Sequence, residues 1–532
     1  MAADNNLPFD GSYWAIQGLL MAGEHPAEDE GPEALQRLDG LVRAGIEVVI
    51  NLTAEGETNR WGNPYFDYEG YLKAAGVEVH RKGIPDMDVP SDGLMDEIMA
   101  LIDRSLAVGK PVYFHCMAGV GRTGTVLGSY LLWKGLAGPN DVFGKIDALK
   151  SKSSLWYSPS PQTRRQREFV LSYGRKNPMK PISHYTGCLV GGAVGDALGA
   201  PVEFYTIRDI RDHHGEAGIT GYVEFPDHTG QFTDDTQMTL FTASGLLSVH
   251  LMDLLSANTG KLVRAVYRSY LNWLLTQGYT PKASALRKEN PGSSDSWLMR
   301  QKLLFSIRAP GTTTLTALKS GGYGNPRQPI NSSKGCGTVM KIAPAGLLYA
   351  GRNREAFRVG VEISAITHGH PTGYLSGGFL ASVIADLAAG VPLITAIRNA
   401  QELLTEWQRR EETARAVEAA LALYHDTCHR RFTVTAEEVE TLGGAWVAEE
   451  ALSISLYASL LFEDDFEKGV LLSVNHSGDS DSTGAVTGNI LGLINGYDSI
   501  PPTWRNNLEG KDIVKEMAER VFGKGRGVLF FK

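Results

Sequence analysis

Apolar and polar positions follow two different rhythms along this chain of 532 residues. Up to about residue 175, short β-branched or aromatic runs alternate with segments of helical periodicity. Three runs predict buried strands: IEVVINLT (46–53), GVEVHRKGIP (76–85) and PVYFHC (111–116). Helices are predicted over 32–45, where Gly45 should end the helix, and over 91–109, 123–136 and 164–176. This alternation is typical of an α/β domain with a small central sheet.

Beyond residue 186 the pattern changes to long helical stretches rich in Ala, Leu and Gly. The clearest are 187–202, 238–255, 354–369, 414–431 and 445–462, and few strand signals interrupt them. Segments 205–230 and 280–335 are rich in Gly, Pro and Ser and predict loops. We therefore expect an α/β domain over 1–175, a proline-containing linker over 176–186 and a mainly helical domain over 187–532.

Composition limits the class of protein without identifying it. A net charge of −9 gives no overall basic field that would attract nucleic acid or an anionic membrane. The four cysteines (Cys116, Cys188, Cys336 and Cys428) form neither a disulfide framework nor a zinc spacing, which favours a reducing compartment. The N-terminus lacks the features of a signal peptide, and no apolar stretch is long enough to span a membrane. These features predict a cytoplasmic protein with no membrane partner.

The segment HCMAGVGRTG (115–124) follows a predicted strand and precedes a predicted helix. It contains G-x-G-x-x-G at Gly119, Gly121 and Gly124, which in a dinucleotide fold is followed by a second strand and an acidic residue about 20 positions on. The chain instead continues into another helical pattern with no second strand. Asp141 lies near the expected distance, but it does not follow a strand. The surroundings therefore disfavour dinucleotide binding.

The same segment suits attack by a cysteine on a phosphate. Backbone N–H groups and the positive end of the following helix would favour the Cys116 thiolate, which is the nucleophilic form. Arg122 can hold two phosphate oxygens, and Thr123 can donate a hydrogen bond to the sulfur. The upstream loop GIPDMDVPS supplies Asp86 and Asp88, either of which could protonate a leaving alcohol. A buried cysteine at a glycine-rich turn is the structural alternative.

With H-C-x5-R-[ST]-G and an upstream I-P-D loop, residues 8–175 resemble the protein tyrosine phosphatase superfamily, especially the small atypical dual-specificity phosphatases. The resemblance implies Cys116 as nucleophile, Arg122 as phosphate ligand and Asp86 as general acid, with Asp88 as the second choice, and no cofactor. None of the loop residues 117–121 is basic, which disfavours polyphosphoinositides. Phosphotyrosine, phosphoserine and small phosphate esters remain open as substrates.

Two acidic clusters stand out in the second half, TDDT (233–236) and HSGDSDSTG (476–484). The first could be an ordinary helix start with acids in its first turn, and the second could be a plain turn. An EF-hand is excluded, because Ile490 stands where a bidentate Glu is required. Together the clusters provide hard oxygen donors suited to a pair of Mg²⁺, Mn²⁺ or Ca²⁺ ions, and such sites usually carry out hydrolysis. The donors are Thr233, Asp234, Asp235, Asp479, Asp481 and Ser482.

Five ordered motifs, at 187–204, 233–239, 334–347, 366–374 and 476–492, resemble the ADP-ribosylglycohydrolase family, which includes the dinitrogenase-reductase-activating glycohydrolases. The resemblance implies an all-α fold and two Mg²⁺ or Mn²⁺ ions. It also implies cleavage of the N- or O-glycosidic bond at C1″ of ADP-ribose. The six oxygen donors named above would be the metal ligands, with Ser482 standing where Thr is common.

The same resemblance assigns further roles. Glu203 would close over the metals and position water or protonate the leaving group, and Asp235 would also take part in catalysis. A diphosphate-binding segment would comprise Ser333, Lys334, Gly335, Cys336 and Gly337, although Cys336 also suits plain packing. His368 would lie near the ligand, or be a satisfied core histidine.

The sequence thus predicts a bifunctional hydrolase that removes ADP-ribose and hydrolyses phosphate monoesters. Its partners would be an ADP-ribosylated protein or other ADP-ribose conjugate, and a phosphorylated protein or small phosphate ester. Nucleic acid enters only as an ADP-ribosylated substrate. Two alternatives remain: the C-terminal domain could bind ADP-ribose without catalysis and target the phosphatase, or both sites could process one ADP-ribose phosphate metabolite in sequence.

Overall fold

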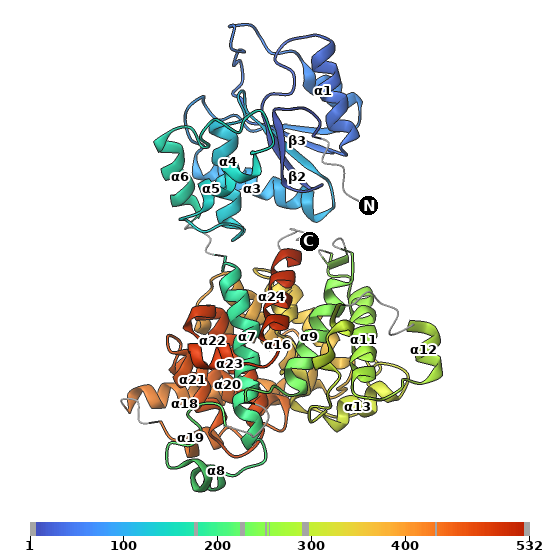
Figure 1. The fold of residues 1–532 in the computed structure, drawn as a ribbon, viewed down its shortest axis with the longest axis vertical. Coiled ribbons are helices and arrows are strands. Elements are labelled where there is room, and N and C mark those ends of the chain that lie inside the picture. Colours follow the sequence, from blue (N-terminus) through green and yellow to red (C-terminus); the bar gives the residue numbers. More distant parts are fainter. Residues whose placement is uncertain are drawn as a thin grey trace. The chain divides into compact units, whose positions relative to one another are not determined.

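The computed structural model describes residues 7–174, 179–223, 229–250, 253–254, 256–289, 297–430 and 434–525. The chain forms two compact units, one ending at Pro181 and one spanning Ile182–Gly525 (Figure 1). The predicted linker, 176–186, lies at this division, but residues 176–178 are outside the described residues. Its last five residues are helical, because α7 already begins at Ile182.

The described part of the first unit contains a five-stranded sheet in the order β1-β2-β5-β3-β4. β1 pairs antiparallel with β2, and the other neighbours are parallel. The strands are β1 (Ser12–Ile16), β2 (Leu20–Gly23), β3 (Val48–Asn51), β4 (Glu78–Arg81) and β5 (Val112–His115). The sequence predicted β3, β4 and β5. It missed the short first hairpin, in which β2 is buried along its whole length and shows no alternation.

Helices cover both faces of this sheet. Leu38 and Leu41 of α1 pack with Tyr68 and Leu72 of α2 in one cluster that also includes Val49 of the sheet. α3 and α4 contact β5, and α4 also packs against α6 (Figure 1). The helices are α1 (Pro32–Arg43), α2 (Tyr68–Ala74), α3 (Asp92–Ala107), α4 (Gly121–Trp133), α5 (Val142–Leu149) and α6 (Arg164–Gly174). The predicted α/β domain with a small central sheet is confirmed.

The regular structure of the second unit's described residues consists of helices, short 3-10 turns and isolated bridges, joined by loops. Its first helices are α7 (Ile182–Gly199), α8 (Ile207–His214), α9 (Asp234–Leu247), α11 (Thr259–Thr276), α12 (Ala283–Glu289), α13 (Thr312–Lys319), α14 (Ala343–Leu348) and α15 (Asn353–Ala365). The remaining helices are α16 (Pro371–Ala388), α17 (Leu393–Leu404), α18 (Glu411–His429), α19 (Ala436–Glu440), α20 (Ala448–Leu461), α21 (Phe466–Val474), α22 (Ser480–Asn495), α23 (Pro502–Asn507) and α24 (Lys511–Gly525). The all-α expectation is confirmed.

The loop predictions in this unit were partly wrong. Segments 205–230 and 280–335 contain α8, α12 and α13, each of which is only seven or eight residues long. The start of α8 carried a local signal that was missed, the Thr206–Asp209 capping box. Residues 224–228 and 290–296 of these segments, and parts of the helix predicted over 238–255, lie outside the described residues. Within the described residues, no helix combines the length and apolarity needed to cross a membrane.

A glycine-lined contact between α7 and α22 positions the functional residues of this unit. A β-carbon built on Gly191 would lie 2.4 Å from the carbonyl oxygen of Gly488, so only glycine permits this backbone approach. Gly199, at the end of α7, meets the backbone of Ser480 at the start of α22 in the same way. The segment after α7, which carries Glu203, therefore lies against the acidic N-terminus of α22.

Candidate active sites

The first candidate site is the turn between β5 and α4. Cys116 directly follows β5 and is 3% exposed. Its N–H donates to Thr123 Oγ1 at 3.0 Å, and the Thr123 hydroxyl donates to Cys116 Sγ at 3.1 Å. This hydrogen bond stabilises negative charge on the sulfur, both in a thiolate nucleophile and in a thiolate leaving group.

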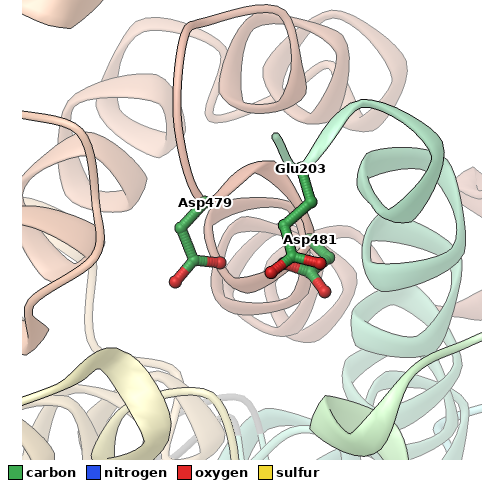
Figure 2. A group of neighbouring side chains, drawn as sticks. All are labelled: Glu203, Asp479 and Asp481. Carbon is green, nitrogen blue, oxygen red and sulfur yellow. The ribbon is translucent and has the colours of Figure 1, made fainter. Parts of the chain in front are cut away.

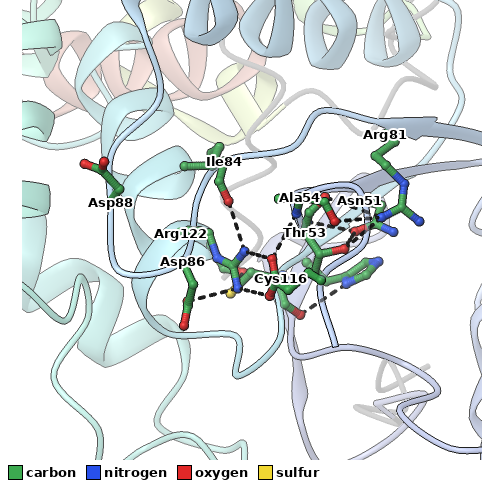
Figure 3. A network of polar contacts seen from close by, with 12 residues as sticks. Asn51, Thr53, Ala54, Arg81, Ile84, Asp86, Asp88, Cys116 and Arg122 are labelled. Atoms are coloured by element: carbon green, nitrogen blue, oxygen red, sulfur yellow. Dashed lines mark hydrogen bonds and ion pairs between the residues drawn. The ribbon is translucent and has the colours of Figure 1, made fainter. Parts of the chain in front are cut away.

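Arg122 is buried beside Cys116 with its guanidinium already oriented. Glu57 accepts from both terminal nitrogens, at 2.6 and 2.7 Å, and the carbonyl oxygen of Ile84 accepts from one of them at 3.0 Å. Asp86 forms an ion pair with the same guanidinium at 3.0 Å (Figure 3). The arrangement holds one cation beside the cysteine sulfur, as binding of a phosphate dianion requires.

Asp86 and Asp88 have different partners. Figure 3 shows the Asp88 carboxylate turned away from Arg122, and it pairs with Arg165 at 2.9 Å. Gln166 fixes the acidic loop by donating to the carbonyl oxygen of Asp88 at 3.1 Å. The structure thus brings Asp86, but not Asp88, to Arg122.

Glu57 was missed by the sequence analysis. It lies 65 residues before Arg122 in a loop between β3 and α2, with no local pattern that would connect the two residues. The buried imidazole of His115 is also part of this site, next to Cys116. Burial lowers the pKa of His115 to about 3, and its Nε2 lies 2.7 Å from the Tyr68 hydroxyl.

The second candidate site is the group of carboxylates where α9 and α22 begin. Thr233 caps α9, and Asp479 caps α22. Glu203, Asp479 and Asp481 each place an oxygen within 4.8 Å of the others, and Figure 2 shows Glu203 and Asp481 side by side, facing Asp479. The capping role expected for Thr233 is therefore real, but capping does not account for Glu203 lying beside Asp479 and Asp481.

Electrostatics confirm that the two acidic clusters share one environment. Burial raises the pKa of Asp234 to about 7, with further contributions from Asp196 and Asp479. Burial and the nearby Asp479 and Asp234 raise that of Glu203 to about 8. The pKa values of Asp235 and Asp481 are also raised, by burial and then by neighbouring carboxylates. These groups repel one another in the charged state.

The donor set fits divalent cations. One Asp235 carboxylate oxygen, Oδ2, is buried and accepts no hydrogen bond from the described residues. Ser482 is buried beside this group, with its N–H donated to Asp481 at 2.9 Å. Carboxylate and hydroxyl oxygens are the ligands that Mg²⁺ and Mn²⁺ prefer, and such ions would neutralise the repulsion.

Asp196 of α7 supports this cluster and was not singled out as a functional residue. Its carboxylate accepts from the N–H groups of Thr233 (2.8 Å) and Thr236 (3.0 Å) and from the Thr236 hydroxyl (2.5 Å). It therefore fixes the start of α9, where Asp234 and Asp235 stand. The sequence did contain one signal that could have identified Asp196: a carboxylate in the middle of a helix made mostly of small residues.

The predicted diphosphate segment forms a turn beside His368. Imidazole Cε1 of His368 would lie 2.9 Å from a β-carbon built on Gly337, so this glycine is required by close packing. The His368 imidazole is buried, and its Nδ1 lies 2.9 Å from the Thr367 hydroxyl. Ser333 contacts the Thr313 hydroxyl at 3.2 Å, and Gly335 forms a bridge with Val447.

Two lysines near this turn already have partners. The Lys334 ammonium donates to Glu412 at 2.8 Å and to Glu449, so it does not present an unpaired charge to a ligand. Lys341 is fully buried and donates to the Thr367 hydroxyl at 2.9 Å, and burial lowers its pKa to about 7. Burial raises the pKa of Cys336, which suits a packing residue rather than a reactive thiol.

These features define a two-part hydrolase: a cysteine-phosphatase unit followed by a helical unit with a buried carboxylate cluster. Residues 30–136 match the family described as "Polymorphic toxin system, DSP-PTPase phosphatase", and residues 177–528 match ADP-ribosylglycohydrolase. Because the second match covers most of the chain, the protein belongs to the ADP-ribosylglycohydrolase family. Both matches are to enzymes, and the chain is an enzyme that joins the two kinds.

Named relatives align with the second unit. ADP-ribosyl-[dinitrogen reductase] glycohydrolase of Rhodospirillum rubrum is 25% identical over 63% of this chain and 93% of its own length. ADP-ribosylarginine hydrolase Tri1 of Serratia proteamaculans is 24% identical over 63% of this chain and 78% of its own length.

A solved structure of a phosphatase, Tk-PTP in the active form, is 25% identical, with a TM-score of 0.26, over 31% of this chain and 97% of that one.

Proposed function

We propose that the second unit releases ADP-ribose from a conjugate by hydrolysing the glycosidic bond at C1″, with divalent metal ions. The observation that carries the proposal is the buried carboxylate cluster, in which Asp235 Oδ2 lacks a hydrogen-bond donor among the described residues. Such a cluster is unfavourable without cations, and its donors are those of a Mg²⁺ or Mn²⁺ site. The relatives from Rhodospirillum rubrum and Serratia proteamaculans are named as a glycohydrolase and a hydrolase of ADP-ribosylated groups.

The proposed metal ligands are Thr233, Asp234, Asp235, Asp479, Asp481 and Ser482, with Glu203 at the edge of the same cluster. Bound metal ions would supply Lewis-acid polarisation of the ribose hydroxyls and water. Glu203 would orient water or protonate the leaving atom. The turn at Ser333, Lys334, Gly335, Cys336 and Gly337, with His368 beside it, would contact the diphosphate, its glycines allowing close approach of the backbone.

The test follows free ADP-ribose by mass spectrometry. Purified protein receives arginine-, serine- and nucleic-acid-linked ADP-ribose with Mg²⁺, Mn²⁺ or EDTA, alongside Asp479→Asn and the control Asp386→Asn, a buried aspartate of α16. Metal-dependent release that is lost in Asp479→Asn alone supports the proposal and identifies the linkage. Tight binding of ADP-ribose without release from any substrate would instead support a targeting role for this unit.

We also propose that the first unit hydrolyses phosphate monoesters through a phosphocysteine. Cys116 Sγ attacks phosphorus while Arg122 binds the non-bridging oxygens, and the bond to the leaving oxygen breaks as Asp86 protonates it. Water then attacks phosphorus, releasing inorganic phosphate and the Cys116 thiolate, which Thr123 stabilises. The Arg122 contacts with Glu57 and Asp86 support this assignment.

The phosphocysteine can be detected directly. Rapid acid quenching during turnover of ³²P-labelled phenyl phosphate should leave up to one covalently bound ³²P label per active site. This label should be absent in Cys116→Ser. Asp86→Asn should slow labelling by an ester with a poor leaving group far more than by one with a good leaving group. Equal labelling of wild type and Cys116→Ser would contradict this mechanism.

A further inference from the structure

Three large exposed aromatic side chains of the phosphatase unit belong to loops that contact its phosphate-binding turn. Among the described residues of this unit, the exposed aromatic side chains are Trp61, Trp156 and Tyr157, which are 71%, 66% and 71% exposed. Scattered exposed apolar residues are ordinary, but rigidly held aromatic groups beside a binding site usually mark a contact surface.

Each of these residues lies in a loop that touches the turn at Cys116–Arg122. Trp61 belongs to the loop in which Glu57 binds Arg122. Trp156 and Tyr157 belong to the loop in which Leu155 packs against Gly119, whose β-carbon, if built, would lie 2.7 Å from Leu155 Cδ1. Met87, also exposed, stands between the two acids of the loop that carries Asp86.

The loop that carries Trp156 and Tyr157 is firmly held. Lys150, which is 1% exposed, donates to the carbonyl oxygen of Leu155 at 3.2 Å and to that of Ser158, on either side of the aromatic pair. The Ser160 hydroxyl donates to the carbonyl oxygen of Val120 at 2.8 Å, which ties the loop to the phosphate turn. The two rings form an edge-to-face pair with centroids 6.0 Å apart.

The Trp61 loop is fixed in a similar way. The side-chain oxygen of buried Asn59 accepts from the N–H groups of Trp61 and Asn63, at 3.0 Å each, and its amide donates to Asp29 at 2.6 Å. The backbone at both aromatic sites is therefore held in place, which lowers the ordering entropy that binding costs.

Charge around the turn distinguishes between classes of substrate. A cavity of about 360 Å³ beside it is lined by five carboxylates and two arginines, Arg37 and Arg60. Both arginines are already paired, Arg37 with Glu24 and Glu33, and Arg60 with Glu28, which leaves the lining with an excess of negative charge. The cavity borders the phosphate turn, because a β-carbon on Gly119 would also lie 2.6 Å from the nitrogen of Glu24. An acidic cavity repels further phosphate groups and attracts a cation.

We propose that Trp61, Trp156 and Tyr157 form an aromatic rim that binds the polypeptide around a phosphorylated residue, with basic residues of that polypeptide directed to the acidic cavity. This inference rests on the proposed phosphatase activity. Aromatic faces accept apolar and cationic side chains, and the uncharged loop 117–121 holds a single phosphate. The competing class is a nucleotide phosphate ester, whose base would stack on the rim but whose diphosphate would meet the carboxylates.

The test uses the full chain and four substrates: a phosphotyrosyl peptide flanked by arginines, the same peptide flanked by glutamates, ADP-ribose 1″-phosphate and p-nitrophenyl phosphate. The variants are Trp61→Ala, the double variant Trp156→Ala/Tyr157→Ala, and Glu30→Gln/Glu33→Gln. Val108→Ala, an exposed apolar residue at the end of α3, is the matched control. Affinity of the Arg-flanked peptide for Cys116→Ser, with and without the rim substitutions, gives a readout without turnover.

We expect kcat/KM for the Arg-flanked peptide to fall about tenfold further in the rim variants than kcat/KM for p-nitrophenyl phosphate. Affinity in the Cys116→Ser background should fall in parallel, and Val108→Ala should change neither. Preference for arginine flanks should shrink in Glu30→Gln/Glu33→Gln. Equal losses on all substrates, or faster hydrolysis of ADP-ribose 1″-phosphate that depends on the rim, would overturn the proposal. A wild-type protein that hydrolyses none of the four would instead refute the phosphatase activity itself.

Discussion

Glu57 binds both terminal nitrogens of Arg122, at 2.6 and 2.7 Å, from a loop far away in sequence. The guanidinium is 2% exposed, so this carboxylate balances a buried charge as well as fixing its orientation. When a phosphate dianion enters, it would take the place of Asp86 on Arg122, while Glu57 and the carbonyl oxygen of Ile84 keep the guanidinium in position.

Glu57→Gln should therefore lower phosphatase kcat/KM by about tenfold to a hundredfold, the effect of one lost charge-assisted hydrogen bond. Steady-state kinetics on p-nitrophenyl phosphate provides the measurement. Glu55→Gln, an exposed carboxylate in the same loop, is the control and should behave as wild type. Equal activity of the two variants would show that Arg122 does not depend on Glu57.

Gly119→Ala should disrupt the phosphate turn. Gly119 has φ +69°, and its new β-carbon would lie 2.6 Å from the nitrogen of Glu24, where only backbone movement gives relief. Gly76→Ala has a similar φ of +85° but meets nothing within 4 Å, so it should cost only about 1 to 2 kcal/mol of stability. Phosphatase assays and thermal unfolding of both variants separate close packing from backbone strain. Matching losses would contradict this account.

Metal-free protein should lose stability as pH rises from about 4 to about 8. The pKa values of Asp234 (about 7) and Glu203 (about 8) exceed those of unfolded carboxyls, near 4, because burial disfavours the charged forms. Within that interval the unfolded state has released protons that the folded state retains, so unfolding becomes easier as pH rises. Thermal unfolding in EDTA from pH 5 to 8 measures this slope.

Adding Mg²⁺ or Mn²⁺ at pH 8 should raise the free energy of unfolding, by about 2.7 kcal/mol at a concentration 100 times Kd. In Asp235→Asn the metal-induced shift should shrink, and the metal-free protein should be more stable than wild type at this pH, because an amide avoids the cost of burying a carboxyl group that is ionised in the unfolded chain. An identical metal response in the variant would remove Asp235 from the site.

Asp196→Asn should weaken metal binding, although Asp196 is not itself one of the proposed metal ligands. The amide would place N–H groups opposite the Thr233 or Thr236 N–H donors, which shifts the start of α9. Titration with Mn²⁺, followed by electron paramagnetic resonance, should show affinity reduced by about tenfold or more. Asp386→Asn, whose carboxylate binds Asn353 and Asn399 instead, should retain wild-type affinity.

The sequence predicted those features whose determinants are local. Strands β3, β4 and β5 and the long helices follow from periodicity, and the residues around Cys116 are adjacent in the chain. Glu57 and Asp196 could not be found in this way, because each acts on residues that only the fold brings near. The short helices α8, α12 and α13 were expected as loops; short helices are weakly marked in a sequence, although the Thr206–Asp209 capping box of α8 is a local signal.

The same limit applies within the carboxylate cluster. The sequence predicted oxygen donors in the acidic clusters at the starts of α9 and α22. That Glu203 lies close to Asp481, however, depends on glycine contacts between α7 and α22. Lys334 shows the opposite case: a basic residue in a predicted diphosphate segment pairs with Glu412 and Glu449 instead.

One crossed measurement tests the central claim, that this chain carries two independent hydrolytic sites. ADP-ribose release and phosphate release are followed in parallel for wild type, Asp234→Asn and Cys116→Ser, each with Mg²⁺ or Mn²⁺. We predict that Asp234→Asn loses only ADP-ribose release and that Cys116→Ser loses only phosphate release. Loss of both activities in either correctly folded variant would contradict two independent sites, and so would ADP-ribose release that survives Asp234→Asn.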